Sequence, residues 1–335
     1  MRPHSLTRNR RFRLGEILGE GSSGIVFRAH DGELDADIAL KALRSVDSAR
    51  FAQLKAEFRA LAGITHPHLV ELHELFVDGP ECYFTMELIG GLPFVDALRR
   101  TGDRVTRVKH AARQLAVGIA AIHSAGKLHR DIKPSNVLLT TDDRVVILDF
   151  GVTTSLRTKG FEPEGGPVGT ALYMAPEQGR GSPPSSAADW YSFGVILFEA
   201  LTGRTPFEGS FYEVLERKRA TPAPSPRALN DDVPGELDEL VRRLLSRDPA
   251  ERAGLADVLT VLDEGGGRRA AAVFVAPFVG RTAELDQLAR ARAQATSDGR
   301  PIVFRMTGES GIGKTETVRR FVSDEIGRAS CRERV

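Results

Sequence analysis

The hydrophobic pattern of this chain changes near residue 90, and this change constrains the fold more than any other feature. From Phe12 to about Leu88, short β-branched or aromatic runs alternate with turn residues, interrupted by one helical stretch at Ser48–Ile64. From Pro93 to about Leu262, apolar residues recur at the spacing of one helix face. This order predicts an α+β fold with two lobes, a small sheet carrying one helix and a larger, mostly helical lobe.

The composition is that of an ordinary soluble globular protein. The 335 residues suffice for a two-lobed unit of about 250–300 residues and a further segment. A net charge of +1 and 41% hydrophobic residues indicate no bulk attraction to nucleic acid or membrane. The longest apolar run, Tyr191–Leu201, is shorter than the roughly 20 residues that span a bilayer and predicts a buried helix. Two cysteines, Cys82 and Cys331, are too few for a disulfide framework and favour a reducing cytoplasm.

Two compositional breaks divide the chain. The N-terminal segment is basic and no apolar signal-peptide segment follows it, so we interpret residues 1–11 as a solvated tail. The run DEGGGRRAAA at Asp263–Ala272 lacks an apolar pattern and indicates a linker, which we place at residues 264–276. These breaks predict a first domain at residues 12–263 and a second segment at residues 277–324.

A glycine-rich stretch near the start of the first domain suggests a phosphate-binding loop. Gly19, Gly21 and Gly24 lie between two strand-like runs instead of opening a helix, which favours a hairpin lid over phosphates and argues against a dinucleotide-binding turn. Lys41 ends an apolar strand, where its ammonium is a point charge suited to phosphates, and Glu57 follows on the predicted helix, where it could pair with Lys41. Taken singly, these residues are also compatible with a tight turn, a solvated lysine and an exposed helix carboxylate.

Four further motifs follow in order and make the pattern specific. They are HRDIKPSNVLL at His129–Leu139, ILDFG at Ile147–Gly151, GTALYMAPE at Gly169–Glu177 and DWYSFG at Asp189–Gly194. Together with the glycine-rich loop, Lys41 and Glu57, they make the stretch from about Phe12 to Leu262 resemble the eukaryotic-type protein kinases. Lys133, two residues after Asp131, is typical of the serine/threonine kinases, and the chain looks closest to their bacterial members. The resemblance implies a two-lobed protein kinase fold with a β-rich N-lobe and a helical C-lobe.

The resemblance implies roles that suit the chemistry of phosphoryl transfer. Since negative charge spreads in the transition state, the protein mainly positions groups and neutralises charge. Lys41 would hold the α- and β-phosphates of ATP, oriented by Glu57; Asp131 would accept the proton of the substrate hydroxyl and Lys133 would steady the γ-phosphate. Mg²⁺ prefers hard oxygen ligands, and two residues are expected to supply them: Asn136 and Asp149. The residues expected around the adenine, with Met86 as gatekeeper and backbone groups of the hinge, are Val26, Ala39, Met86, Glu87, Ile89 and Leu138.

Other residues are expected to have structural or regulatory roles. We interpret His129 and Asp189 as structural, Glu177 as a partner of Arg252, and the helix Ala187–Leu201 as a buried support beneath the catalytic loop. Protein substrates with Ser or Thr are the expected partners. Phosphorylation between the DFG and APE motifs could order that segment against Arg130, or the hydroxyls there could be ordinary loop residues. The candidate hydroxyls are Thr153, Thr154, Ser155 and Thr158.

A second nucleotide-binding motif lies near the C-terminus. GESGIGKT follows an apolar strand-like run at Pro301–Met306 and precedes a helix start, as in P-loop proteins. Together with FVGRTAELDQL upstream, it resembles the beginning of STAND and AAA-type regulatory ATPases; a chance glycine turn is the alternative. The residues expected at the phosphates and Mg²⁺ are Gly308, Gly313, Lys314 and Thr315.

The end of the chain limits this second module. Only twenty residues follow the motif, too few for the acidic strand that hydrolysis requires, so residues 277–324 are expected to be a truncated P-loop α/β fragment. The last residues, IGRASCRERV, can be encoded by a sequencing-adapter-like DNA sequence, and we interpret residues 325–335 as an artefact; a genuine basic tail is the alternative.

The sequence therefore predicts an ATP- and Mg²⁺-dependent serine/threonine protein kinase. Two other functions stay open: a pseudokinase scaffold, and a kinase-fused ATP-driven regulatory switch whose main output lies in a missing C-terminal part. The presence of Lys41, Asp131, Asn136 and Asp149 favours an active kinase over a scaffold.

Overall fold

The computed structural model describes most of the first domain and a small part of the second. The described residues are 11–21, 24–44, 51–78, 81–99, 103–149, 168–263, 285, 287–292 and 294. The chain divides into two compact units, Met1–Val273 and Phe274–Val335, and the few described residues of the second unit are helical. Several predicted features lie outside the described residues: the tail 1–10, the linker 264–276, Thr153, Thr154, Ser155, Thr158, Gly308, Gly313, Lys314, Thr315 and the segment 325–335.

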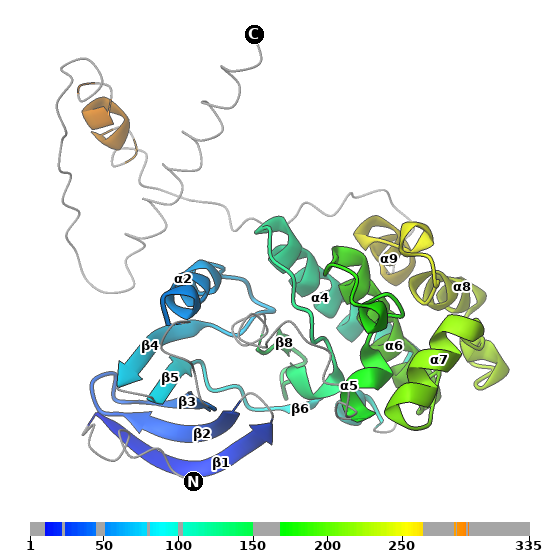
Figure 1. Ribbon diagram of the computed structural model, residues 1–335, viewed down its shortest axis with the longest axis horizontal. Coiled ribbons are helices and arrows are strands. Elements are labelled where there is room, and N and C mark those ends of the chain that lie inside the picture. Colours follow the sequence, from blue (N-terminus) through cyan, green and yellow to red (C-terminus); the bar gives the residue numbers. More distant parts are fainter. Residues whose placement is uncertain are drawn as a thin grey trace. The chain divides into compact units, whose positions relative to one another are not determined.

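The N-lobe is an antiparallel sheet of five strands in the order β1-β2-β3-β5-β4 (Figure 1). The strands are β1 (Phe12–Gly21), β2 (Gly24–Asp31), β3 (Ala36–Leu43), β4 (Leu72–Asp78) and β5 (Glu81–Met86). The helix α2 (Phe51–Ala62) packs on the sheet through Leu54, Phe58 and Leu61, which recur at helical spacing. The ring of Phe58 lies 5.7 Å from that of Phe84 on β5.

Strand alternation on β3 decides which side chains face the cleft. Ile38 and Leu40 belong to a small apolar cluster with Phe27 on one side of the sheet, whereas Ala39 belongs to the main core on the other side. Lys41 shares the parity of Ala39 and lines the cavity described below. A register slip of one residue would turn Lys41 away from the cleft, so the pairing of β3 with its neighbours positions the lysine.

The C-lobe is mostly helical and is built around one buried helix, as the sequence predicted. Every residue of α6 from Ala188 to Leu201 is buried apart from Glu199, and α6 packs against α3, α4, α5 and α8. The helices are α3 (Phe94–Leu98), α4 (Arg104–Ser124), α5 (Val168–Tyr173), α6 (Ser186–Thr202), α7 (Phe211–Ala220), α8 (Gly235–Leu244) and α9 (Leu255–Leu262), and the strands of a small second sheet are β6 (Leu92–Pro93), β7 (Val137–Leu139) and β8 (Val145–Ile147).

Local sequence signals set several helix ends. Asp103 caps α4, its carboxylate accepting a hydrogen bond from the amide of Thr106. Ser210 and Glu213 form a capping box at the start of α7. Gly203 ends α6 in the left-handed conformation, with φ of 83°, which glycine adopts without strain. None of the described helices combines the length and hydropathy needed to cross a bilayer.

The two lobes form an α+β fold with a β-sheet N-lobe and a helical C-lobe, so the predicted two-lobed architecture is confirmed. Backbone contacts join the lobes behind the cleft. The amide of Val70 donates to the carbonyl of Ile147 on β8, and the amide of Ile147 donates to the carbonyl of His68. These bonds hold the segment before β4 against the strand that leads directly to Asp149.

Candidate active site

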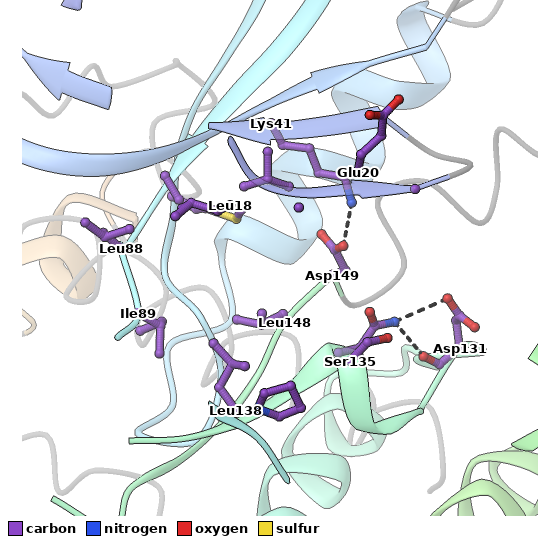
Figure 2. Close-up of a pocket in the computed structure, with 18 of the residues that line it drawn as sticks. Leu18, Glu20, Lys41, Leu88, Ile89, Asp131, Ser135, Leu138, Leu148 and Asp149 are labelled. Carbon is purple, nitrogen blue, oxygen red and sulfur yellow. Dashed lines mark hydrogen bonds and ion pairs between the residues drawn. The ribbon is translucent and has the colours of Figure 1, made fainter. Parts of the chain in front are cut away.

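A cavity of about 730 Å³ lies between the N-lobe sheet and the segments around β7 and β8. Its volume is in the range of small-molecule sites in proteins, about 300–1,000 Å³. Figure 2 shows Leu88, Ile89 and Leu138 toward one end of the cavity and Lys41, Asp149 and Asp131 toward the other. The predicted residues that line it are Gly19, Gly21, Gly24, Val26, Ala39, Lys41, Met86, Glu87, Ile89, Asp131, Lys133, Asn136, Leu138 and Asp149.

The glycines of the lid have different physical reasons to be glycine. Gly24 has φ of 155°, and a Cβ there would lie 2.1 Å from the carbonyl oxygen of Ala42, so the backbone requires glycine. A Cβ on Gly19 or Gly21 would meet nothing within 4 Å. These two glycines line the cavity, so the missing side chains leave room for a ligand to approach the backbone.

Lys41 and Asp149 form the ion pair at the polar end of the cavity. The Nζ of Lys41 lies 2.5 Å from Oδ2 of Asp149 (Figure 2). The lysine side chain is 2% exposed and the aspartate 25%, so this charge pair is well shielded from water. Asp149 has φ of 53°, a left-handed conformation that is uncommon for a residue with a side chain and is found at functional sites.

Glu57, the predicted partner of Lys41, is half-buried on α2. It accepts a hydrogen bond of 3.3 Å from the side chain of Gln53, one helical turn earlier. The ion pair that the structure gives to Lys41 is with Asp149, so the pairing of Lys41 with Glu57 stays a prediction.

Three polar side chains converge in the loop before β7. The Nζ of Lys133 lies 2.7 Å from Oδ2 of Asp131. The amide nitrogen of Asn136 donates to the backbone carbonyl of Asp131 at 2.8 Å and to its Oδ2 at 3.2 Å. The NH₂ group of Asn136 is directed to Asp131 by these bonds. Its side-chain oxygen is the atom that can bind a cation.

A buried carboxylate anchors this loop from below. Asp189, on α6, accepts hydrogen bonds of 2.9 Å from the backbone amides of His129 and Arg130, and its Oδ2 lies 2.8 Å from Nε2 of His123. Its side chain is 3% exposed. Arg130 adopts φ of 69°, so the anchored backbone is held in the left-handed conformation immediately before Asp131.

The structural interpretations of two further residues are confirmed. His129 is fully buried; its Nε2 donates to the carbonyl of Leu148 and its Nδ1 accepts from the amide of Asp131. Arg252 forms two hydrogen bonds, of 2.6 and 2.7 Å, with the carboxylate of Glu177. Such a two-point contact between a guanidinium and a carboxylate is strong and directional.

At the apolar end of the cavity, the side chain of Glu87 forms an ion pair with Arg144. Its carboxylate pairs with Arg144 at 2.9 Å, and its amide donates to the carbonyl of Glu71. These bonds leave the carbonyl of Glu87 as its backbone group available to a ligand. The sequence reasoning missed Leu18 and Leu148, which also line the cavity and directly precede Gly19 and Asp149.

Lys218, on α7, was also missed. It is 1% exposed, although it lies in the highly charged run ERKRA. Phe211, Val214 and Leu215 form the buried stripe of α7, and Lys218 continues that stripe at helical spacing. A charged residue on the apolar face of a predicted helix was therefore the available signal.

A sheet lobe and a helical lobe that enclose a cavity with these charged residues define a protein kinase. Residues 12–261 match the model of the protein kinase domain family, and the chain belongs to this family. This confirms the resemblance noted from the sequence.

The relatives identify the kind of kinase. The chain is 32% identical to the serine/threonine-protein kinase PknA of Mycobacterium tuberculosis, over 96% of this chain and 77% of that protein. It is 31% identical to the serine/threonine-protein kinase PknE of the same species, over 72% of this chain and 43% of the relative. A solved structure of Rad53, residues 1–466, in complex with AMP-PNP matches 75% of this chain with a TM-score of 0.63 and 27% identity; the match spans 64% of that chain. The protein is a serine/threonine protein kinase.

We expect Asp189→Asn to slow phosphoryl transfer and to destabilise the C-lobe. The substitution replaces an acceptor oxygen with an NH₂ group that faces backbone N–H donors, so kcat should fall roughly 10- to 100-fold and the free energy of unfolding by about 1–3 kcal/mol. Steady-state kinetics and urea unfolding measure the two effects. Asp35→Asn is the matched control because its side chain is 97% exposed. Wild-type kcat and an unchanged urea midpoint in Asp189→Asn would show that the loop does not depend on this carboxylate.

Proposed function

We propose that the cavity binds ATP with Mg²⁺ and that Asp131 directs the γ-phosphoryl group to a serine or threonine hydroxyl of a protein substrate. The observation that carries the proposal is the convergence of five polar side chains in one cavity. These are Lys41, Asp131, Lys133, Asn136 and Asp149.

The shape and lining of the cavity support a nucleotide ligand. Apolar side chains at one end, among them Val26, Ala39 and Leu138, suit a flat base, and the backbone carbonyl of Glu87 suits hydrogen bonding to the edge of that base. The open approach to Gly19 and Gly21 suits phosphates, which accept hydrogen bonds from backbone amides. Lys41 lies at the polar end, where its ammonium would hold two phosphates.

The residues expected to hold Mg²⁺ suit that ion. Asn136 and Asp149 line the same cavity and provide oxygen donors, which Mg²⁺ prefers. When bound, Mg²⁺ would supply positive charge that neutralises the phosphates. Asp149, which is paired with Lys41 in this structure, would be a ligand of the cation, and Lys41 would then be available to the phosphates. Glu57 is the carboxylate we propose to orient Lys41 in that state.

The reaction follows from the positions of Asp131 and Lys133. The substrate hydroxyl oxygen forms a bond to the γ-phosphorus while the bond from that phosphorus to the bridging oxygen breaks, and ADP leaves with the electron pair. The proton of the hydroxyl passes to the carboxylate of Asp131. Lys133, whose ammonium lies 2.7 Å from that carboxylate, is close enough to neutralise the oxygens of the transferred group.

We expect Asp131→Asn to reduce phosphate transfer to Ser/Thr peptides by about 100- to 10,000-fold while ATP affinity stays within about twofold, because the amide cannot accept the proton. Transfer of radiolabelled γ-phosphate and ATP titration measure the two quantities. Ser246→Ala, far from the cavity lining, is the control. A wild-type protein that binds ATP but transfers no phosphate would favour the scaffold function instead.

We further propose that the protein phosphorylates itself between the DFG and APE motifs. The candidate acceptors are Thr153, Thr154, Ser155 and Thr158, which lie outside the described residues. The support is the sequence position of Arg130, a cation directly before Asp131 whose backbone is anchored by Asp189. A phosphate paired with Arg130 would order the segment.

Replacement of all four hydroxyl residues by alanine should lower peptide kinase activity about tenfold or more and prevent any increase of activity during incubation with ATP, since the ordering phosphate can no longer be added. Mass spectrometry of the wild-type protein after incubation with ATP locates the modified residues. Alanine at Thr260, which is exposed on α9, is the control. Unchanged activity and onset in the fourfold variant would contradict this form of regulation.

We also propose a second nucleotide site in residues 277–324, on the basis of the motif at Gly308–Thr315 and its resemblance to STAND and AAA-type ATPases. Backbone amides of the loop would bind phosphates, Lys314 would reach the terminal ones and Thr315 would contact Mg²⁺. The kinase would then carry a second nucleotide-binding site with a regulatory role.

Lys314→Ala should lower the ATP-binding stoichiometry from two to one per chain and leave peptide phosphorylation within about twofold of wild type, because it removes only the phosphate contact of the second site. Equilibrium dialysis with labelled ATP measures the stoichiometry, and Lys55→Ala, an exposed lysine on α2, is the control. One bound nucleotide in both the wild type and Lys314→Ala would contradict the second site.

A further inference from the structure

Lys218 is a buried cation in the C-lobe whose bonds all go to one short segment. Its Nζ donates to the backbone carbonyls of Ala171, Leu172 and Met174 at 2.9, 2.7 and 2.7 Å. A lysine ammonium has three N–H donors, so this arrangement satisfies all of them. The side chain is 1% exposed, and among the described residues no carboxylate lies within ion-pairing distance of it.

The three carbonyls that bind Lys218 lie at the C-terminal end of α5 and directly after it. Ala171 and Leu172 belong to the last turn of α5, where carbonyls have no amide four residues ahead within the helix. A cation at this end also compensates the partial negative charge of the helix C-terminus. The hydroxyl of Ser192, on α6, donates to the carbonyl of Tyr173. All four carbonyls from residue 171 to residue 174 are therefore bound from the C-lobe core.

The same helix that receives this segment also anchors the catalytic loop. Asp189 and Ser192 lie one turn apart on α6; the first binds the amides before Asp131 and the second binds Tyr173. Residues 188–198 of α6 are all buried, so this part of the helix links the two contacts through the packed core. Lys218 approaches from α7 and closes the other side of the segment, so the position of residues 171–174 relative to Asp131 depends on α6 and α7 together.

The groups around Lys218 influence the protonation of its ammonium. On α6, the ring of Tyr191 lies 5.1 Å from the ammonium, and the guanidinium of Arg252 lies 5.0 Å from the same ring while paired with Glu177. On α5, the hydroxyl of Tyr173 is bound to Glu199. Burial raises the pKa values of both tyrosines, so they stay neutral, and burial lowers the pKa of Lys218 to about 7. The three carbonyl dipoles act in the opposite direction and favour the charged form.

We propose that Lys218 is a positioning residue for phosphoryl transfer to protein substrates: by binding the carbonyls of residues 171, 172 and 174, it holds the segment after the activation loop at a fixed place relative to Asp131. The inference rests on the kinase function. Lys218 is not among the residues that line the cavity; it acts through the backbone of α5 and Met174.

The test compares Lys218→Met, Lys218→Arg and Arg217→Met in the full chain. Methionine keeps the length and apolar stem of lysine but removes the donors, arginine keeps the charge and donors, and Arg217 is the exposed neighbour on the same helix. We expect Lys218→Met to lower kcat/KM for a Ser/Thr peptide by about tenfold or more, with KM for ATP unchanged. Lys218→Arg should restore part of this loss, and Arg217→Met should behave as wild type.

A pH profile separates positioning from general destabilisation. As the pH rises through about 7, Lys218 in the folded protein loses a proton. The neutral amine has two N–H donors, so one of the three carbonyls loses its partner. Wild-type kcat/KM for the peptide should therefore decrease on this limb, and the same limb should be missing from the pH profile of Lys218→Arg, which stays charged.

Hydrogen exchange of peptides covering residues 168–177 gives a readout that does not need activity. At constant pH, exchange in this segment should be faster in Lys218→Met than in Arg217→Met. Wild-type kcat/KM and exchange in Lys218→Met would overturn the proposal. If the wild type phosphorylates no peptide, the kinase function fails and the positioning role with it, and the exchange data alone then report whether Lys218 holds the segment.

Discussion

The structure depends most on the burial of Asp189 in the centre of the C-lobe. A carboxylate that is 3% exposed must have its oxygens satisfied by donors, because a buried unpaired charge is strongly destabilising. The amides of His129 and Arg130 supply two of these donors. These bonds stabilise the buried charge of Asp189. They also hold Arg130 in the left-handed conformation, which is unfavourable for a residue with a side chain. Asp131 is the next residue, so the anchored backbone of His129 and Arg130 also fixes its position.

The N-lobe contributes the opposite charge through a different constraint. The alternation of β3 sends Ala39 and Lys41 to the cleft and Leu40 to the small apolar cluster, so packing of the sheet orients the ammonium. Its contact with Asp149 joins residues from the two lobes across the cavity. In this arrangement the two charges neutralise each other, and a nucleotide with a cation would supply a new partner to each. The ion pair of Lys41 and Asp149 thus compensates both charges within the cavity.

Buried cations in the C-lobe are satisfied in two contrasting ways. Arg252 meets the carboxylate of Glu177 with two hydrogen bonds, so the two opposite charges compensate each other. Lys218 meets only carbonyl dipoles, which stabilise the ammonium without cancelling its charge. Both lie against the ring of Tyr191 on α6. The hydrogen bonds of Lys218 depend on the protonation of its ammonium. They support residues 171–174, which precede Glu177.

The sequence by itself determined the fold class, the family and the residue types of the active site. Its change of period near residue 90 predicted the two lobes, and contiguous motifs such as HRDIKPSN and ILDFG carried the polar residues that line the cavity. Such signals are local, so they are readable from one chain. Only the tertiary structure decided which charges meet: Lys41 and Asp149 are 108 positions apart, and Lys218 and Ala171 are 47 apart. The run ERKRA is highly charged, yet packing of α7 on α5 buries its lysine, Lys218. Side-chain burial and pairing depend on elements brought together by folding, and no local pattern records which partner a buried charge will find.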